Sequence, residues 1–466
     1  MTGTGDAPRP AGADRDRPHA PAATPTPEAP AGQLDELLSH RVWLGRLALW
    51  GGACAVAVAA IVLAVATDTA EAYFREATGR SPYLPLVLTP LGLGLSAWLM
   101  RFFPGTGGSG VPPTLAALAL AERSARSGLI GLRIALGKIV LTVLGIGTGG
   151  SFGREGPMIQ IGASIMHALG RHGRGTHPGL DRSLILAGAA AGTAAAFNTP
   201  LTGIVFAIEM SRSLEERTSG VILTAVLLAG FIALAVLGDY TYFGRAPAAV
   251  GLEDAWIAVG VVGVAGGLAG GLFSRILIFT LGGLPGRIGA LARRHPVGFA
   301  AACGLAVALI GLASQGTVYG TGYYEARQLV EGTGEVHWSF GPAKFLATIV
   351  SAASGVPGGL VAPSLAIGAG FGANLAPLMP YLPATAVALL GMAAFFAGVL
   401  RVPITAFVIV LEMTAARGML LPLIATSLVA TGLSRLICPQ PLFQALAARL
   451  LGPGRPPAEP AAPPPR

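Results

Sequence analysis

Long apolar stretches alternate with short polar breaks along most of the chain, from Val42 to about Ile437. Several of these stretches reach the roughly 20 residues that a helix needs to cross a lipid bilayer. The clearest predicted spans cover residues 47–67, 84–99, 221–237 and 256–281, the last interrupted by glycines. The pattern therefore predicts an all-α, polytopic integral membrane protein.

Other apolar stretches are too short to cross a membrane on their own. They cover residues 158–169, 183–197 and 201–210, and a further apolar series starts near Lys344. Proline or glycine stands at the breaks between them, where a regular helix stops. We expect half-helices that meet inside the membrane, because irregular backbone at that depth must line a cavity or be buried in protein.

Composition supports the membrane assignment. Hydrophobic residues make up 53% and charged residues 12% of the 466 positions, whereas about 25% charged residues is usual in soluble domains. The formal charge of +8 comes mainly from arginines between apolar stretches, as in 171–182 and 287–294. Such loops are typical of the cytoplasmic side, so the charge indicates topology and no nucleic-acid partner. The three cysteines are far apart and suggest neither a disulfide framework nor a metal site.

The two ends of the chain differ in composition from the rest. Residues 1–32 are rich in Ala, Pro, Thr, Asp and Arg, and residues 451–466 are rich in Pro and Ala. Both are predicted to be disordered tails, and no cleaved signal peptide is expected. Residues 33–46 predict a short amphipathic helix at the membrane surface. We therefore expect one transmembrane domain over residues 33–450, with both termini in the cytoplasm.

The stretch from Gly149 to Ala163 carries the most distinctive chemistry, a glycine-rich turn (G-G-S-F-G-R-E-G-P) that opens into an apolar run. Pro157 fits the first turn of a helix, where its missing N–H costs nothing, and the glycines leave backbone N–H groups uncovered. Free N–H groups at a helix start form a site for an anion. A capped structural turn is the commoner role of such a cluster, so the context decides between them.

The chain also resembles itself, because Lys138–Ala163 aligns without a gap to Lys344–Ala369. The two lysines that start this alignment are the only two in the chain. The matched pairs include Gly153 with Gly359, Pro157 with Pro363, Gly162 with Gly368, Gly188 with Gly391, Thr202 with Thr405 and Glu209 with Glu412. The alignment indicates an internal duplication, with halves predicted at about 47–220 and 250–440.

Duplicated membrane halves with broken helices in matching places are typical of transporters, whose binding site lies near the membrane midplane. If two helix N-termini point inward, that site favours an anion. The repeated turn reads G-R-E-G-P in one half and G-L-V-A-P in the other, so Glu155 is the only acid at either turn. A carboxylate there can occupy the place of the anion, or bind a proton and leave it. We predict that Glu155 is a gate and a proton carrier.

A second glycine-rich break, residues 105–112 (G-T-G-G-S-G-V-P), follows the second predicted span. So many glycines cannot continue as regular helix. The break is either a loop at the membrane surface or a broken helix at the binding site, where Ser109 adds a hydroxyl donor.

These motifs resemble the signatures of the CLC family of chloride channels and chloride/proton antiporters, namely G-S-G-V-P at 108–112, G-R-E-G-P at 153–157 and G-L-V-A-P at 359–363. The resemblance continues in A-A-A-F-N-T-P-L-T-G at 194–203, R-V-P-I-T at 401–405 and L-E-M-T at 411–414. It implies two inverted halves of tilted helices, a homodimer, and one anion pathway in each subunit. Chloride is then the substrate, and no cofactor or metal is expected.

The resemblance also implies the residues of the site. Glu155 matches the external gating glutamate, and Ser109 matches the serine that donates its hydroxyl to a central chloride. The backbone amides of Leu360 and Val361 would face the same ion from the second half. The other anion-binding residues that the resemblance implies are Gly110, Gly153, Arg154, Gly156 and Phe443.

Three positions depart from the bacterial antiporters of the family. Pro113 stands where many carry Glu, Phe443 stands in place of their central tyrosine, and Met210 stands in place of their inner glutamate. A methionine cannot relay a proton, although some family antiporters lack the inner acid. Coupled chloride/proton exchange and a passive chloride channel therefore both stay open. A membrane enzyme is a distant alternative, because no H-E-x-x-H or paired-aspartate pattern is present.

Other polar residues of the predicted membrane region are expected to act without binding ions. Lys138 is expected to tune the field near Glu155, and Lys344 to be structural. Glu209 and Glu412 end apolar stretches and are expected to be helix-end partners. A polar interval after Gly316 is predicted to be a loop with short helices at the membrane surface, carrying Tyr319, Tyr323, Tyr324 and His337.

Overall fold

The structure is a computed structural model that describes residues 40–170, 178–211 and 216–452. The chain divides into two compact units, Met1–Leu44 and Gly45–Arg466. The predicted tail 1–32, the first half (33–39) of the predicted surface helix 33–46 and nearly all of 451–466 lie outside the described residues. The described residues form helices joined by turns, which confirms the predicted all-α class.

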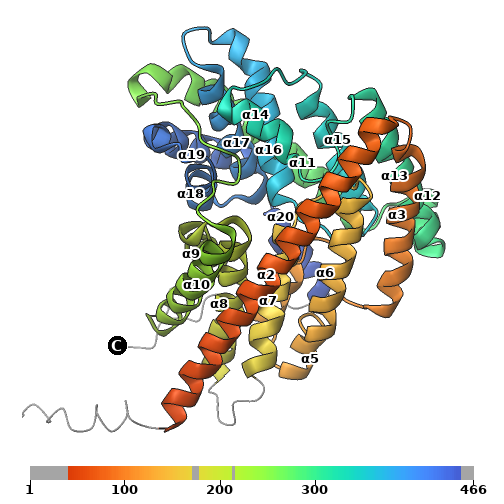
Figure 1. Ribbon diagram of the computed structural model, residues 1–466, viewed down its shortest axis with the longest axis vertical. Helices are drawn as coiled ribbons and strands as arrows, with labels where there is room; N and C mark the ends of the chain where they lie inside the picture. Colours follow the sequence, from red (N-terminus) through yellow and green to blue (C-terminus); the bar gives the residue numbers. More distant parts are fainter. Residues whose placement is uncertain (1–39, 171–177, 212–215, 453–466) are drawn as a thin grey trace, which may run out of the picture. The chain divides into compact units, whose positions relative to one another are not determined.

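The described chain contains two successive series of helices (Figure 1). The first series is α2 (His40–Arg80), α3 (Pro85–Leu99), η1 (Met100–Phe102), α4 (Val111–Ala119), α5 (Arg123–Ser127), α6 (Leu132–Gly147), α7 (Glu155–Gly170), α8 (Pro178–Phe197), α9 (Pro200–Ser211) and α10 (Glu216–Leu237). The second series is α11 (Leu252–Leu281), α12 (Gly286–Arg294), α13 (Pro296–Ala313), α14 (Tyr323–Glu331), α15 (Phe340–Ala353), α16 (Val361–Leu375), η2 (Ala376–Leu378), α17 (Ala384–Leu400), α18 (Pro403–Thr414), η3 (Arg417–Met419), α19 (Leu420–Ile437) and α20 (Leu442–Leu451). Eight helical segments of the described residues are long and apolar enough to cross a membrane.

Several predicted segments correspond closely to observed helices. The span predicted at 84–99 is α3, and the short segments at 158–169, 183–197 and 201–210 lie within α7, α8 and α9. The break between α8 and α9 has a local cause, because Asn198 adopts a left-handed φ of 58° and Pro200 starts the next helix. The interval after Gly316 contains the short helix α14, as predicted.

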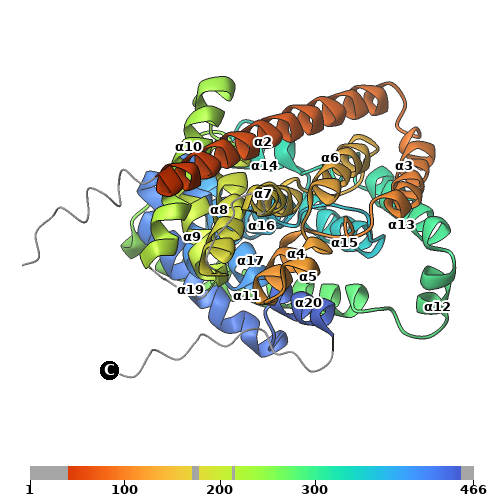
Figure 2. The ribbon, with the colours of Figure 1, turned by 90° about the horizontal axis from the view of Figure 1, so that it is seen from below.

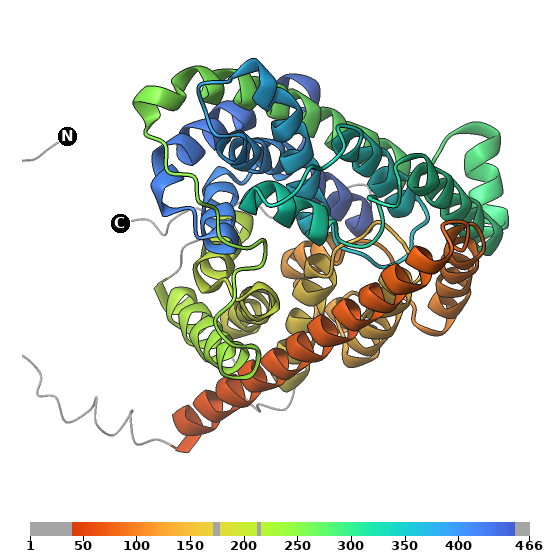
Figure 3. The same ribbon diagram turned by 45° about the horizontal axis from the view of Figure 1, so that its top comes forward.

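The first span is longer than predicted, because α2 continues as one helix to Arg80 (Figure 3). The predicted span 47–67 stops just before two acids, Asp68 and Glu71. In the fold both acids have partners on other elements. Asp68 accepts a hydrogen bond from Arg154 at 2.5 Å, and Glu71 lies beside Thr321 at 3.4 Å. Acids that are paired in this way do not end the helix.

The glycines of α11 do not interrupt that helix, contrary to the prediction. They lie where α11 packs closely against α17 and α19. A Cβ at Gly266 would lie 2.5 Å from the Cβ of Ala394, and one at Gly267 would lie 2.6 Å from the carbonyl oxygen of Ala430. Small residues let helix backbones approach one another in a membrane, so these glycines serve packing between helices.

Glycines also bring two equivalent helix pairs together. A Cβ at Gly162 in α7 would lie 2.1 Å from the carbonyl oxygen of Gly188 in α8. A Cβ at Gly368 in α16 would lie 2.5 Å from the carbonyl oxygen of Gly391 in α17. Because the sequence alignment pairs these residues, the same backbone contact is made twice. Figure 2 shows α7 beside α8, and these two helices pack against each other.

Glu209 and Glu412 form reciprocal helix caps. Glu209, on α9, caps the start of α18, and Glu412, on α18, caps the start of α9. The N–H and Oγ1 of Thr405, in the first turn of α18, donate to Oε2 of Glu209 at 2.7 and 2.6 Å. The N–H and Oγ1 of Thr202, in the first turn of α9, donate to Oε2 of Glu412 at the same two distances. Carboxylates at helix N-termini are stabilising. The expected helix-end role is confirmed, and each acid serves the other helix instead of its own.

Candidate functional site

The three glycine-rich turns that the sequence singled out meet in one backbone junction. The Gly153 N–H donates to the Gly359 carbonyl at 2.8 Å, and the Gly359 N–H donates to the Gly153 carbonyl at 2.6 Å. The Gly108 N–H donates to the Gly355 carbonyl at 3.2 Å, and the Gly358 N–H donates to the Gly108 carbonyl at 3.4 Å. Helices α4, α7 and α16 all begin within a few residues of this junction.

At this junction the backbone segments before α4 and α7 lie so close together that residues with a side chain would not fit between them. Gly110 has a φ of 97°, in the left-handed region that favours glycine. A Cβ at Gly110 would lie 2.3 Å from the carbonyl oxygen of Gly156, and a Cβ at Gly156 would lie 2.3 Å from the carbonyl oxygen of Ser109. The starts of α4 and α7 therefore touch backbone to backbone, which holds Ser109 against the first turn of α7.

Glu155 is the first residue of α7 and is fully buried. Its Oε2 would lie 2.1 Å from a Cβ at Gly153 and 2.8 Å from one at Gly359, so the carboxylate lies against both repeated turns. The backbone N–H of Ala362, in the first turn of α16, is near the carboxylate. Neither oxygen makes a well-formed hydrogen bond with a described residue. Glu155 thus places a poorly bonded acceptor between the starts of two helices.

Ser109 and Lys138 supply polar groups on the other side of the junction. The Ser109 hydroxyl is buried without a hydrogen-bond partner among the described residues. The Lys138 ammonium, fully buried in α6, donates to the Gly108 carbonyl at 2.6 Å. The described residues include no salt-bridge partner for it. A buried hydroxyl and a buried cation beside three helix starts favour negative charge at this place.

The Arg154 side chain points away from the junction toward α2. Its Nη1 donates to the carbonyl of Ala64 at 3.0 Å, to Thr67 at 3.2 Å and to Asp68 at 2.5 Å. The guanidinium also lies 5.3 Å from the ring centroid of Tyr242. The charge of the guanidinium is therefore paired with Asp68, and only the backbone of Arg154 belongs to the junction.

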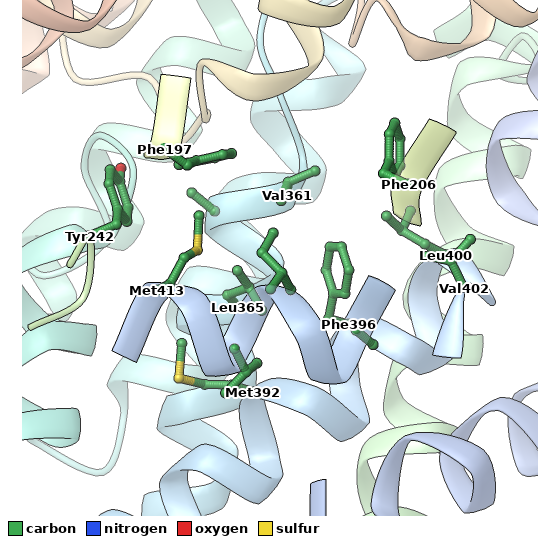
Figure 4. Close-up of a cluster of buried hydrophobic side chains, with 14 of the residues drawn as sticks. Phe197, Phe206, Tyr242, Val361, Leu365, Met392, Phe396, Leu400, Val402 and Met413 are labelled. Carbon is green, nitrogen blue, oxygen red and sulfur yellow. The ribbon is translucent and has the colours of Figure 1, made fainter. Parts of the chain in front are cut away.

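Leu360 and Val361 stand at the start of α16, which begins at Val361. The first N–H groups of a helix have no carbonyl partner within it, so those of this turn face the junction as donors. The side chains around this start are apolar. Figure 4 shows side chains from several helices gathered there, among them Phe197, Tyr242, Val361, Leu365, Phe396 and Met413. An apolar surrounding strengthens any charge interaction with those donors.

Phe443 and Met210 line one cavity of about 370 Å³. Phe443 is 3% exposed and belongs to α20, which packs against α4, the helix that begins just after Ser109. Arg401, with a left-handed φ of 58°, also lines the cavity. The complete lining is Glu209, Met210, Leu400, Arg401, Val402, Arg435, Pro439, Pro441, Phe443 and Gln444. Two of the three positions that depart from the family pattern thus line the same cavity.

Comparison with known proteins identifies the family. The family model described as voltage gated chloride channel matches residues 91–435. This chain belongs to that family, the CLC family. It is 33% identical over 404 residues to an H(+)/Cl(-) exchange transporter ClcA of Yersinia pestis, covering 78% of this chain and 79% of that one. It is 32% identical over 390 residues to a protein of the same name from Klebsiella pneumoniae, with the same coverage.

Two solved CLC structures resemble the fold. A slow cyanobacterial Cl⁻/H⁺ antiporter matches with a TM-score of 0.76 and 26% identity, over 87% of this chain and 99% of that one. A CLC-type fluoride/proton antiporter matches with a TM-score of 0.70 and 27% identity, over 86% and 97%. The chain is therefore an integral membrane transport protein, and the membrane enzyme that the sequence left open is excluded.

Several polar residues around this site were not predicted from the sequence. Asp68, Glu71, Tyr242 and Thr321 were given no role, although all of them lie within or beside the membrane region. Asp68 and Glu71 carried a usable signal, because an acid inside an apolar span has a partner or a function. Tyr242 and Thr321 carried none, since they belong to irregular segments between helices.

Proposed function

We propose that this CLC protein exchanges chloride for protons across the cell membrane, with Glu155 as both gate and proton carrier. The observation that carries the proposal is the Glu155 carboxylate, which is fully buried against both repeated turns and poorly hydrogen-bonded. The relatives named exchange transporters, at 33% and 32% identity, support coupling to protons.

Competition for one place links the two ions. The ionised Glu155 carboxylate is held by the helix N-termini that would hold an anion. Once it binds a proton, the side chain is neutral and those helix starts attract it far less. Chloride then takes its place, and the neutral side chain is free to carry the proton to solution. The return of the ionised carboxylate displaces chloride, so that the two ions move in opposite directions.

The residues proposed to hold chloride are those of the junction. Ser109 offers its unpaired hydroxyl, and Leu360 and Val361 offer the first N–H groups of α16. The role of Gly110, Gly153 and Gly156 is to let the backbone segments of the junction approach closely, because an added Cβ at any of them would clash with neighbouring atoms. Arg154 contributes backbone only, because its guanidinium is engaged by Asp68.

A proton that reaches Glu155 from the cytoplasmic side needs a route past Met210. Glu209 does not supply one, because both of its oxygens accept hydrogen bonds from the first turn of α18. The cavity beside Met210 and Phe443 has room for several water molecules, by its volume of about 370 Å³. We propose that water in this cavity carries the proton.

The test is proton uptake driven by a chloride gradient in liposomes, with the membrane potential clamped. We expect uptake by the unmodified protein. We expect Met210→Glu to change its rate by less than about tenfold, because water already serves the route. Chloride flux without proton uptake would show that the second candidate, a passive chloride channel gated by Glu155, is correct. The absent inner acid and the absent phenol at Phe443 are the observations that favour that candidate.

Phe443→Tyr is expected to tighten chloride binding by about 1 kcal/mol, roughly fivefold in Kd, because the phenol restores the donor that the family's central tyrosine supplies. Calorimetric titration with chloride measures the change. Phe231→Tyr is the matched control, since Phe231 is 63% exposed on α10 and its new hydroxyl would lie outside the site. Equal affinities in all three proteins would remove Phe443 from the anion site.

The proposal includes the organisation of the transport unit. We propose two inverted halves, about 47–220 and 250–440, within a transmembrane domain over residues 33–450. The duplicated glycine contacts and the reciprocal caps of α9 and α18 support this division. We further propose a homodimer with one pathway in each subunit and both termini in the cytoplasm, which subunit counting of single labelled complexes and labelling from either side would test.

A further inference from the structure

A chain of buried polar side chains leads from Glu155 toward the far end of α2. Tyr242, Thr321 and Glu71 are 3%, 1% and 5% exposed. Tyr242 is within electrostatic reach of Glu155, and its hydroxyl interacts with the Thr321 side chain. Thr321 places its Oγ1 3.4 Å from Oε2 of Glu71. Two buried hydroxyl groups thus belong to the same polar cluster as two buried carboxylates, in a protein that the proposed function requires to move protons.

Glu71 faces charged groups from several elements. Lys344 approaches it from α15, Glu325 from α14, and Asp68 from its own helix. Lys344 is fully buried and Glu325 is 6% exposed. Arg75 adds a second cation, because its Nη1 donates to Oε1 of Glu325 at 3.0 Å. The cluster thus contains two buried acids, one buried lysine and one arginine that reaches the surface.

The hydrogen bonds leave one of the two buried acids, Glu325, incompletely satisfied. The Lys344 ammonium donates to the carbonyls of Val318 at 2.8 Å and Gly320 at 2.7 Å. Its shortest hydrogen bonds therefore go to backbone carbonyls and not to the two acids. Oε2 of Glu325 is buried without a partner among the described residues. The Glu71 carboxylate lies directly against Gly320, where a Cβ would be 2.2 Å from Oε1. An unpartnered buried carboxylate oxygen is a place where a proton lowers the desolvation cost.

The cluster is close to solvent on one side. The Arg75 side chain is 41% exposed and that of Asp68 is 61% exposed. Both belong to the part of α2 that leads to Arg80, at the opposite end from the N-terminus. With the N-terminus in the cytoplasm, as predicted, a helix that crosses the membrane puts this end on the outer side.

We propose that Glu71 is a second proton-binding residue, which exchanges protons between the outer solution and Glu155 through Thr321 and Tyr242. The proposal rests on the proton-carrying role of Glu155 under the proposed function. In the inward step the Glu71 carboxyl gives its proton to the Thr321 hydroxyl, Thr321 passes its own proton to Tyr242, and Tyr242 passes its own to Glu155. Each hydroxyl regains the proton it loses, so only the two carboxyl groups change charge.

The test compares Glu71→Gln, Glu71→Asp and the matched control Glu76→Gln in liposomes. Glu76 lies on the same helix, but its side chain is 59% exposed and pairs with Arg80 at the surface. Proton uptake driven by chloride is measured over a series of outer pH values. We expect Glu71→Gln to slow uptake about tenfold and to flatten its dependence on outer pH, because glutamine cannot bind the proton. Glu71→Asp is expected to keep that dependence, and Glu76→Gln to match the parent.

A purely structural role for Glu71 predicts a different result. Glu71→Gln would then keep the parent's dependence on outer pH, whatever its rate, and the proposal would be overturned. Tyr242→Phe is a second variant for the case that Glu71→Gln does not fold, since it removes one hydroxyl and no charge. An unchanged pH profile in Tyr242→Phe would also overturn the relay.

The same proteins separate this proposal from the proposed function. If the parent moves no protons, the proposal of chloride/proton exchange is wrong. Protonation of Glu155 would still gate the channel, so the chloride flux of the parent is then measured as a function of outer pH. Loss of that pH dependence in Glu71→Gln would then support the relay in a channel. Retention of the dependence would contradict the relay without bearing on exchange.

Discussion

Replacing Glu155 with glutamine is expected to abolish proton movement while chloride movement continues. Glutamine has nearly the same shape but no titratable proton, and it carries no charge to be held by the starts of α7 and α16. Proton uptake driven by chloride should fall to the level of empty liposomes. Chloride flux should persist and lose its dependence on pH. Both are measured in one preparation with a pH-sensitive dye and a chloride electrode.

Glu253→Gln is the matched control for this change. Glu253 lies in the first turn of α11 as Glu155 lies in the first turn of α7, but it is exposed and outside the junction. It should leave both fluxes as they are in the parent. Proton uptake that continues in Glu155→Gln would remove Glu155 from the proton route and with it the proposed exchange mechanism.

Gly156→Ala is expected to eliminate chloride binding or to unfold the junction. The new Cβ would lie 2.3 Å from the carbonyl oxygen of Ser109 and 2.4 Å from its Oγ. The first of these atoms is backbone, so α4 and α7 would have to separate. Overpacking of this kind costs about 1–3 kcal/mol or more, and the separation would move the Ser109 hydroxyl away from the anion. Thermal unfolding in detergent and chloride calorimetry measure the two effects.

The comparison variant is Gly260→Ala in α11, where no atom lies within 4 Å of the added Cβ. Alanine is the better helix former there, by roughly 1 kcal/mol, so this variant should be at least as stable as the parent. Parent-like chloride affinity in Gly156→Ala would mean that the close contact between α4 and α7 does not position the anion donors.

The helices themselves follow from local sequence. The predicted segments at 84–99 and 201–210 correspond to α3 and α9, because apolar stretches and the prolines and glycines that end them act through nearby backbone. The junction was also predictable, through the repeat. Equivalent sequences adopt equivalent backbone, so Gly153 and Gly359, which align in sequence, meet and exchange hydrogen bonds.

Polar residues inside apolar stretches were misjudged for a physical reason. The span predicted at 47–67 stops before Asp68 and Glu71, yet α2 continues past both of them to Arg80. An unpaired acid in a membrane is costly, whereas one that has a partner is tolerated. Whether a partner exists depends on elements far away in sequence, such as Thr321, which is 250 residues from Glu71.

The two lysines separate what local sequence predicts from what packing adds. Lys138 and Lys344 occupy equivalent positions in the repeat, and the sequence places both in the predicted membrane region. The fold gives them different partners, because Lys138 donates to Gly108 in the junction and Lys344 donates to the loop around Gly320, beside Glu71. Local sequence sets the backbone on which each lysine stands. The charges that surround it come from segments that lie far apart in the sequence. Only packing brings these segments together, and no local sequence pattern shows which of them will meet.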